Sequence, residues 1–271
     1  MRKLQNVLFG SDAESFVCVE DKITGEPVYV TAEHFIKGTK HDPFIMEKTP
    51  NGVYMSCLDN VLAEFGIPPV RRENPEVWVQ SFHKAKELVS KQLPAGHFLK
   101  QMPAVIMTDD QLVTEHSRTF GCDPTFCCWT WETNPSPEAE DKNLRSSGLH
   151  VHVGYDNSDV NMTMDIMKYF DLYVGVPATL IEPANKRREL YGKAGECRVK
   201  DYGGEYRVLS SYFMSSDELL HWVFKASNDA VSAFEKEEYD INSLEARITN
   251  AISNNDANEA KSLVKEFGIL V

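Results

Sequence analysis

The sequence predicts an α+β protein with a mainly antiparallel sheet and a helical C-terminal subregion. Segments with strand-like alternation occur near the start and in the middle of the 271-residue chain, with helical patterns between and after them. The regular strand–helix alternation of a doubly wound α/β protein is missing. No linker stands out, so we expect one domain, residues 1–214, with a helical subregion, residues 215–271, packed on it.

The N-terminal part is expected to be mostly strands. Strand-like alternation marks residues 4–9, 15–20, 21–30 and 52–57. A turn over GSDAE, residues 10–14, is expected to separate the first two strands, and Thr24-Gly25 forms the turn of a hairpin within 21–30. The segment 58–69 has apolar residues at mixed spacing and is expected to stop at Pro68-Pro69.

The first clear helix follows Asn74, which is placed as an N-cap with Pro75 at the first helical position. Apolar residues then recur at helical spacing through residue 89. The middle of the chain predicts three further strands, at residues 103–107, 126–132 and 148–155. We expect a helix over 161–176, a loop and strand over 187–211, and mostly helix from 216 onward.

Composition excludes several classes of protein. The net charge of −13 argues against a general nucleic-acid-binding surface. The sequence contains no run of 18 or more apolar residues, so we expect no membrane-spanning helix. Acidic residues occur too close to the start of the sequence for a signal peptide. The six cysteines show no metal-clip spacing, so we expect a reduced, cytoplasmic setting.

Three pairs of polar residues lie two positions apart on predicted strands, and each pair therefore shares one face of its strand. They are Asp12 with Glu14, His150 with His152, and Glu205 with Arg207. Carboxylates and imidazoles are ligands for divalent cations, and guanidinium groups hold phosphate or carboxylate oxygens. Taken singly, each pair has an ordinary alternative: exposed acids, structural histidines, or a cross-strand ion pair.

Other charged residues extend this set: Glu64 in an apolar run, Arg198, Arg187 and Arg188. A sheet face that carries metal ligands and phosphate-binding arginines explains them together, and it suits ATP-dependent chemistry. The P-loop pattern GxxxxGK[ST] and the protein-kinase motifs are absent.

The order of these motifs resembles that of the glutamine synthetase superfamily. GSDAESF resembles the superfamily's GxExEF strand, SSGLHVHVG its GSGxHxH strand, and GGEYR its RxExR strand. DNVLAEFGIPP, FGCDP and RRELYGKAGECR extend the likeness to the phage-associated carboxylate–amine ligases, near the glutamate–cysteine ligases. The likeness runs from about residue 8 to 213. It implies a glutamine synthetase-like catalytic domain, with a curved sheet covered by helices on one face.

The resemblance also implies roles for individual residues. Metal binding is implied for Asp12, Glu14, Glu64, His150, Glu205 and Asp123. Nucleotide or phosphate binding is implied for His152, Arg207, Arg187 and Arg188. Arg198, Arg207 and Glu205 would form the catalytic set.

Three departures from the superfamily pattern matter. Asp12 is one methylene shorter than the usual glutamate. Gly203 stands where RxExR has its first arginine, which Arg187 or Arg188 could replace. The superfamily's N-terminal domain, which completes a neighbouring subunit's site in glutamine synthetase, is missing, so this chain must close its site in another way.

The implied reaction joins a carboxylate to an amine at the expense of ATP, with Mg²⁺ or Mn²⁺, through an acyl phosphate. The implied partners are small-molecule or peptide carboxylates and amines, with no membrane, and a homo-oligomer remains open. Three alternatives stay open as well: a guanidino-kinase-like phosphotransferase, a metal-dependent hydrolase, and a non-catalytic protein that retains the ligase fold. A phage-encoded enzyme acting in the host cytoplasm is the expected setting.

Overall fold

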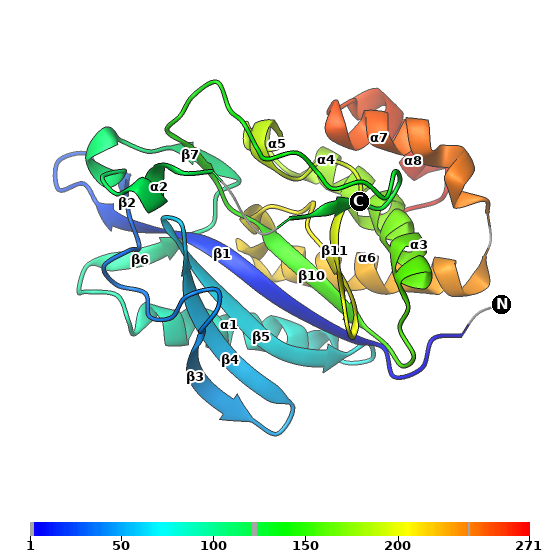
Figure 1. Ribbon diagram of the computed structural model, residues 1–271, viewed down its shortest axis with the longest axis horizontal. Coiled ribbons are helices and arrows are strands. Elements are labelled where there is room, and N and C mark those ends of the chain that lie inside the picture. The colour runs from blue at the N-terminus through cyan, green and yellow to red at the C-terminus, as the bar shows by residue number, and fades with distance from the viewer. Residues whose placement is uncertain (1–2, 121–123, 238) are drawn as a thin grey trace.

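The computed structural model describes residues 3–120, 124–237 and 239–271 (Figure 1). Among these residues, ten strands form one antiparallel sheet with the main order β3-β4-β5-β1-β10-β12-β11-β8, while β2 and β6 pair with the far end of the long strand β1. Its strands are β1 (Leu8–Glu20), β2 (Pro27–Val30), β3 (Phe44–Thr49), β4 (Gly52–Asp59), β5 (Leu62–Arg71), β6 (His97–Lys100), β8 (Phe126–Cys127), β10 (Leu149–Gly154), β11 (Glu196–Lys200) and β12 (Gly203–Tyr206). A separate two-stranded sheet pairs β7 (Ala104–Ile106) with β9 (Leu144–Ser146).

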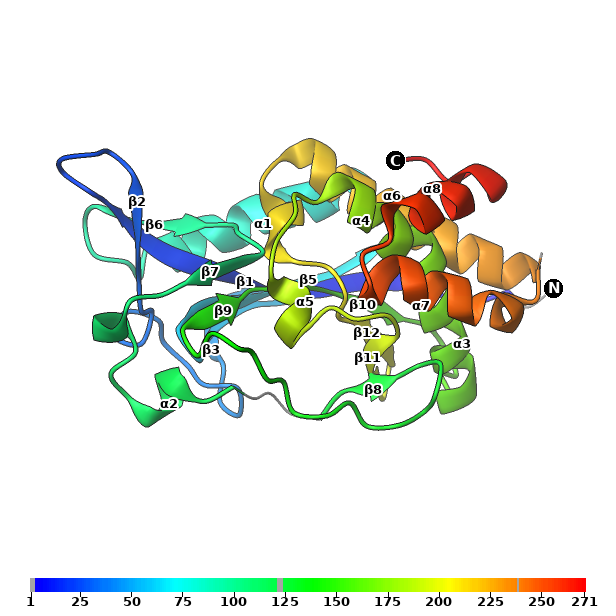
Figure 2. The same ribbon diagram turned by 90° about the horizontal axis from the view of Figure 1, so that it is seen from above.

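Helices cover one face of this sheet, as Figure 2 shows from above. The covering helices are α1 (Pro75–Ser90), α3 (Val160–Phe170), α4 (Val176–Ile181), α6 (Asp217–Lys236), α7 (Glu245–Ser253) and α8 (Ala257–Glu266). The short helices α2 (Glu115–Arg118) and α5 (Arg187–Leu190) lie outside this layer. Helix α1 packs on β5, α3 packs on β12, and α6 packs on both helices. Helices α7 and α8 pack on α4. The predicted fold class, α+β with a mainly antiparallel sheet and a helical C-terminal region, is confirmed.

The alternation of side chains along the strands explains why one face attracts the helices. Ala13 on β1, Phe65 on β5 and Val151 on β10 are buried on the helix side, where Phe9 packs edge-on against Phe224 of α6 at 5.4 Å. The intervening residues point to the opposite face and are mostly polar. The sheet therefore separates an apolar core from a polar surface.

Strand β1 is continuous, and the turn predicted at residues 10–14 is wrong. Those residues pair with β5 on one side and with β10 on the other, so their backbone groups are satisfied as a central strand. Five polar or small residues in a row resemble a turn in the sequence. Here they instead form the centre of β1, and Asp12 and Glu14 project from the polar face of the sheet.

The predicted stop at Pro68-Pro69 is also wrong, because β5 runs through both prolines. The register between β1 and β5 shifts at this point, and β4 pairs only with the earlier part of β5. Proline lacks an N–H donor, and a bulge where the neighbouring strand is no longer hydrogen-bonded is a place where a sheet tolerates it. The strand predicted over 126–132 is limited to Phe126–Cys127, since Trp131 adopts a left-handed backbone with φ of 64°.

Other predicted elements are confirmed: β4, the hairpin between β1 and β2, helix α1 and strand β10. The helix predicted over 161–176 consists of α3, a π-helical turn at Asp171–Gly175, and α4. Asn74 precedes α1 as expected, but its side chain makes no capping hydrogen bond. None of the described helices is both long enough and apolar enough to cross a membrane.

Candidate active site

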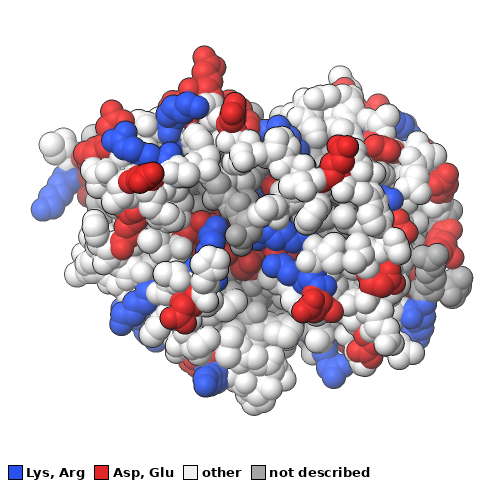
Figure 3. All heavy atoms as spheres, viewed as in Figure 1, with Lys and Arg blue, Asp and Glu red and all other residues white. Residues whose placement is uncertain are grey.

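The polar face of the sheet gathers the charged residues that alternate with the buried ones. Figure 3 shows basic and acidic side chains meeting around a hollow near the middle of this face. They come from adjacent strands in the order β4, β5, β1, β10, β12 and β11. The residues on this face are Asp59, Glu64, Asp12, Glu14, His150, His152, Glu205, Arg198 and Lys200.

Asp12 lies at the centre and joins the two histidines of β10. Its Oδ1 atom is 2.9 Å from His150 Nδ1 and 3.1 Å from His152 Nε2. Burial works to raise the pKa of Asp12, but His152 and His150 outweigh it and hold this pKa well below its usual range. Burial and the nearby Arg207 lower the pKa of His150 to about 4, against the pull of Asp12. Burial opposes charging of His152, yet Asp12 raises its pKa.

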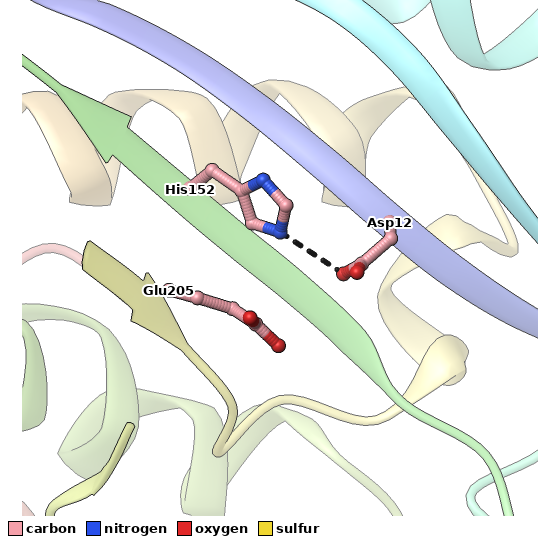
Figure 4. A group of neighbouring side chains, drawn as sticks. All are labelled: Asp12, His152 and Glu205. Carbon is pink, nitrogen blue, oxygen red and sulfur yellow. Dashed lines mark hydrogen bonds and ion pairs between the residues drawn. The ribbon is translucent and has the colours of Figure 1, made fainter. Parts of the chain in front are cut away.

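Glu205 of β12 is fully buried and surrounded by basic groups. Its carboxylate contacts the Arg207 guanidinium, lies 3.4 Å from Arg198 Nη1 and lies 2.8 Å from Lys200 Nζ. Burial and Asp12 oppose ionisation, but Arg207 and the histidines lower the pKa of Glu205 to about 2. The carboxylate therefore stays ionised. Figure 4 shows Asp12, His152 and Glu205 pointing toward one another from three neighbouring strands.

A second acidic group lies beside this cluster. Glu14 is directly opposite Glu64 in the β1–β5 register, and its Oε2 accepts a hydrogen bond of 2.6 Å from the Gly148 N–H. Burial and then Asp59 raise the pKa of Glu14 to about 8, against Arg207 and the Gly148 hydrogen bond. Burial, Asp59 and neighbouring acids raise the pKa of Glu64 well above its usual range. This region has more carboxylates than nearby cations.

Two adjoining cavities open on this face, with volumes of about 50 Å³ and about 160 Å³. Asp59, His150 and Arg207 line both of them. The smaller cavity also has Glu14 and Glu196, while the larger has Lys40, Arg198 and Lys200. Both cavities are therefore lined by acidic and basic side chains together, and they meet at the histidine and arginine of the cluster.

The residues present fit a hard divalent cation. One ligand atom each from Asp12, His152 and Glu205 lies within 4.8 Å of the others. Two carboxylates and an imidazole suit Mg²⁺ or Mn²⁺, which favour oxygen-rich sites. The raised pKa values of Glu14 and Glu64 are also what buried acids show when no cation balances them.

Not every predicted site residue lies in the cluster. Arg187 lines the smaller cavity, but all three of its guanidinium nitrogens donate to main-chain carbonyls, those of Ser147, Val208 and Arg207. Arg188 lines neither cavity and pairs with Glu182 at 3.4 Å. Asp123 lies outside the residues that the structure describes.

Several residues of the site were not predicted from the sequence. Lys200 is two positions from Arg198 on β11, the same spacing that identified the other pairs. Tyr202, in the turn after β11, places its hydroxyl 3.0 Å from His152 Nδ1. Lys40, from the loop before β3, contacts Asp59 at 2.8 Å, and the Asp59 charge raises the pKa of Lys40 against the effect of burial. No periodic pattern marks Lys40 or Tyr202.

The fold and site define an α+β protein whose open sheet face combines carboxylates, histidines and a cluster of basic groups. Residues 143–257 of the chain match the family described as phage phiEco32-like COOH-NH2 ligase, type 2. This match contains the histidine strand and the Glu205 strand. The predicted resemblance to the phage-associated carboxylate–amine ligases is confirmed over these residues.

Two solved structures were also found to be similar to the chain. A bifunctional glutathione synthetase from Pasteurella multocida is 12% identical, with 98% of this chain and 47% of that chain covered, at a TM-score of 0.39. A Plasmodium falciparum glutamine synthetase is 11% identical, with 86% and 52% covered, at a TM-score of 0.42. The chain spans about half the length of either protein. No curated protein sequence matches the chain.

Proposed function

We propose that the protein is an ATP-dependent carboxylate–amine ligase that uses Mg²⁺ or Mn²⁺ and forms an amide through an acyl phosphate. One observation carries the proposal: Asp12, His150, His152 and Glu205 converge on a face that also holds Arg198, Lys200 and Arg207. Metal-binding and phosphate-binding chemistry thus share one site. The match of residues 143–257 to a carboxylate–amine ligase family supports the same activity.

The reaction consists of two displacements. A carboxylate oxygen of the first substrate attacks the γ-phosphorus of ATP, and the bond to the β-phosphate oxygen breaks to release ADP. The amine nitrogen of the second substrate then attacks the acyl carbon, inorganic phosphate leaves with the electrons of its C–O bond, and the amine loses a proton. The protein mainly positions the reactants and neutralises charge.

The basic residues of the larger cavity suit the phosphates. Arg198, Lys200 and Lys40 line it, and Arg207 lies where the two cavities meet. Their positive charges would favour the negative charge that develops on the transferred phosphoryl group. Asp12, His152 and Glu205 would hold the cation, which supplies Lewis-acid stabilisation of phosphate oxygens when it is bound. The smaller cavity, lined by Glu14, is the proposed place of the other substrates.

The arrangement of helices supports a catalytic rather than a purely structural role. A non-catalytic relative would be expected to have diverging site side chains or a cavity filled by the C-terminal region. Here the side chains converge, α6 packs with α1 and α3 on the apolar side of the sheet, and α7 and α8 pack on α4 (Figure 2). We further propose that the enzyme is phage-encoded and acts in the host cytoplasm.

The proposal is tested by measuring ADP formation with Mg²⁺ or Mn²⁺ against pooled carboxylic acids and amines, with mass spectrometry of the products. A product with the mass of two substrates less one water, formed only when both are present, supports ligation. ADP formation that needs a guanidino compound alone supports a phosphotransferase. A product formed without ATP supports a hydrolase. Absence of both nucleotide binding and turnover contradicts the proposal.

A further inference from the structure

Tyr202 is the aromatic residue next to the proposed cation ligands. Its ring stacks on His152, with ring centroids 5.9 Å apart and planes inclined by 27°. Its hydroxyl oxygen lies 3.0 Å from His152 Nδ1, while the other ring nitrogen, Nε2, lies 3.1 Å from Asp12 Oδ1. The two nitrogens of His152 therefore have different partners, a hydroxyl and a carboxylate.

The surrounding sheet leaves room for this pair of rings. Gly10 is directly opposite His152 in the β1–β10 register, and a Cβ atom there would lie 3.5 to 3.9 Å from the His152 side chain. Gly154 lies two residues beyond His152 on the same strand face, and a Cβ atom there would lie 3.6 Å from the Tyr202 ring. These distances are ordinary van der Waals contacts, so the two glycines lie directly beside the rings.

We infer that Tyr202 is a positioning residue whose hydroxyl sets the orientation and tautomer of His152 for cation binding. The inference rests on the cation site of the proposed function. A neutral imidazole carries one N–H donor and one acceptor nitrogen, and the partner of one nitrogen decides the role of the other. Histidine ligands of metals commonly donate their second ring N–H to a nearby oxygen, which fixes the ring.

A tyrosine hydroxyl suits both states of His152 because it both donates and accepts. In the neutral ring without a cation, we assign Nε2–H as the donor to Asp12 and the Tyr202 O–H as the donor to Nδ1. To offer the Nε2 lone pair to a cation, His152 must carry its proton on Nδ1, which then donates to the Tyr202 oxygen. The hydroxyl needs only to rotate between these two states. A carboxylate in place of the Tyr202 hydroxyl could only accept, so it would favour the tautomer with the proton on Nδ1.

The first test is direct Mn²⁺ binding to the Tyr202→Phe variant, measured by electron paramagnetic resonance without nucleotide or substrate. Phe keeps the stacked ring and removes only the hydroxyl. We expect Mn²⁺ affinity to fall about tenfold, the lower end of the effect seen when such supporting contacts are lost. Tyr169→Phe is the matched control, since it removes a hydroxyl that bonds to the Tyr239 carbonyl in the helical layer. That variant should bind Mn²⁺ as the wild type does.

The second test reads the tautomer itself. Nitrogen-15 NMR of labelled histidine, assigned with a His152→Gln variant, reports which ring nitrogen carries the proton. At a pH above the pKa of His152, we expect the proton on Nε2 in the ion-free protein and on Nδ1 when Mg²⁺ is added. In Tyr202→Phe this exchange should require more Mg²⁺.

The outcomes separate this inference from the proposed activity. Equal Mn²⁺ affinity in Tyr202→Phe and the wild type would overturn the inference, even if the enzyme ligates its substrates. Weak binding in Tyr202→Ala but not in Tyr202→Phe would assign the effect to the ring rather than the hydroxyl, and would also overturn it. A wild type that binds no Mn²⁺ overturns the inference together with the cation site. A tenfold loss in Tyr202→Phe supports it, whether or not ATP turnover is found.

Discussion

Glu14 on β1 lies directly opposite Glu64 on β5, so two carboxyl groups face each other on the polar side of the sheet. Only 7% of Glu14 is exposed, and Asp59 lies on the same face from β4. Like charges this close oppose ionisation in a poorly solvated place. In the ion-free protein the pair is therefore a source of instability at neutral pH, which a nearby bound cation would relieve.

The raised pKa of Glu14 should make the stability of the folded protein depend on pH. The pKa of Glu14 is about 8 in the folded protein and near 4.5 when it is exposed, so between these values the folded state holds a proton that the unfolded state has released. Stability therefore falls as pH rises from about 4.5 to 8. We expect the Tm of the ion-free wild type to fall over this range more than the Tm of Glu14→Gln, as measured by calorimetry. Mn²⁺ should raise the wild-type Tm more at pH 8 than at pH 6, and identical pH profiles for the two proteins would contradict the prediction.

Glu205 should be needed for both folding and activity. Its carboxylate pairs with three basic side chains in a buried place, so Glu205→Gln removes the negative charge that they share. Breaking a buried ion pair on one side costs about 3–5 kcal/mol, and we expect a loss of this size in urea unfolding together with loss of ATP turnover. Asp229→Asn, which breaks the exposed pair with Lys225, is the control and should cost at most about 1 kcal/mol. Equal stability of the two variants would show that the basic groups do not depend on Glu205.

Much of the site followed from the two-residue period of strands. Asp12 with Glu14 and His150 with His152 were each expected on one strand face, and they are. The period does not say which strands are neighbours. That β10 lies between β1 and β12 depends on long-range pairing, which local pattern does not show. Lys200 lies two positions from Arg198, but it reaches the site only because β11 pairs with β12.

Other features could not be predicted from local pattern. GSDAE has the composition of a turn, yet pairing on both sides makes residues 10–14 the centre of β1. Arg187 and Arg188 are equivalent in sequence, but one is buried under main-chain carbonyls and the other pairs with Glu182. Tertiary packing, and the main-chain carbonyls that still need a hydrogen-bond donor, determine where a long flexible side chain points. Lys40 reaches the site from a loop, where no periodicity applies.

Gly203 should tolerate no side chain, including the arginine that the superfamily pattern has there. Its φ is +143°, and a Cβ atom would lie 2.2 Å from the Val153 carbonyl oxygen of the neighbouring strand. Gly203→Ala should therefore disturb the pairing of β10 with β12 and lower the Tm strongly. Gly96→Ala is the matched control, because Gly96 also has a positive φ of +83° but nothing within 4 Å of its Cβ position. A similar loss of Tm in both variants would mean that only the backbone angle matters and that the close approach of β10 does not.

The geometry of Arg207 predicts that Lys cannot replace it. One of its guanidinium nitrogens contacts Glu205 and lies 3.3 Å from His150 Nδ1, while the side chain lines both cavities. A lysine ammonium is a single point charge and cannot keep these contacts while it also faces a phosphate. We expect Arg207→Lys to lower the rate of ATP turnover by about 10²-fold, the loss typical of removing one donor that stabilises a transition state.

Arg247→Lys is the control for this exchange, because Arg247 pairs with Glu259 and Glu266 in the C-terminal helices and touches neither cavity. That variant should turn over ATP at the wild-type rate. If Arg207→Lys also kept the full rate, with an unchanged KM for ATP, the guanidinium would have no part at the phosphates. Its role would then be limited to holding Glu205 ionised, a task that an ammonium group can perform as well.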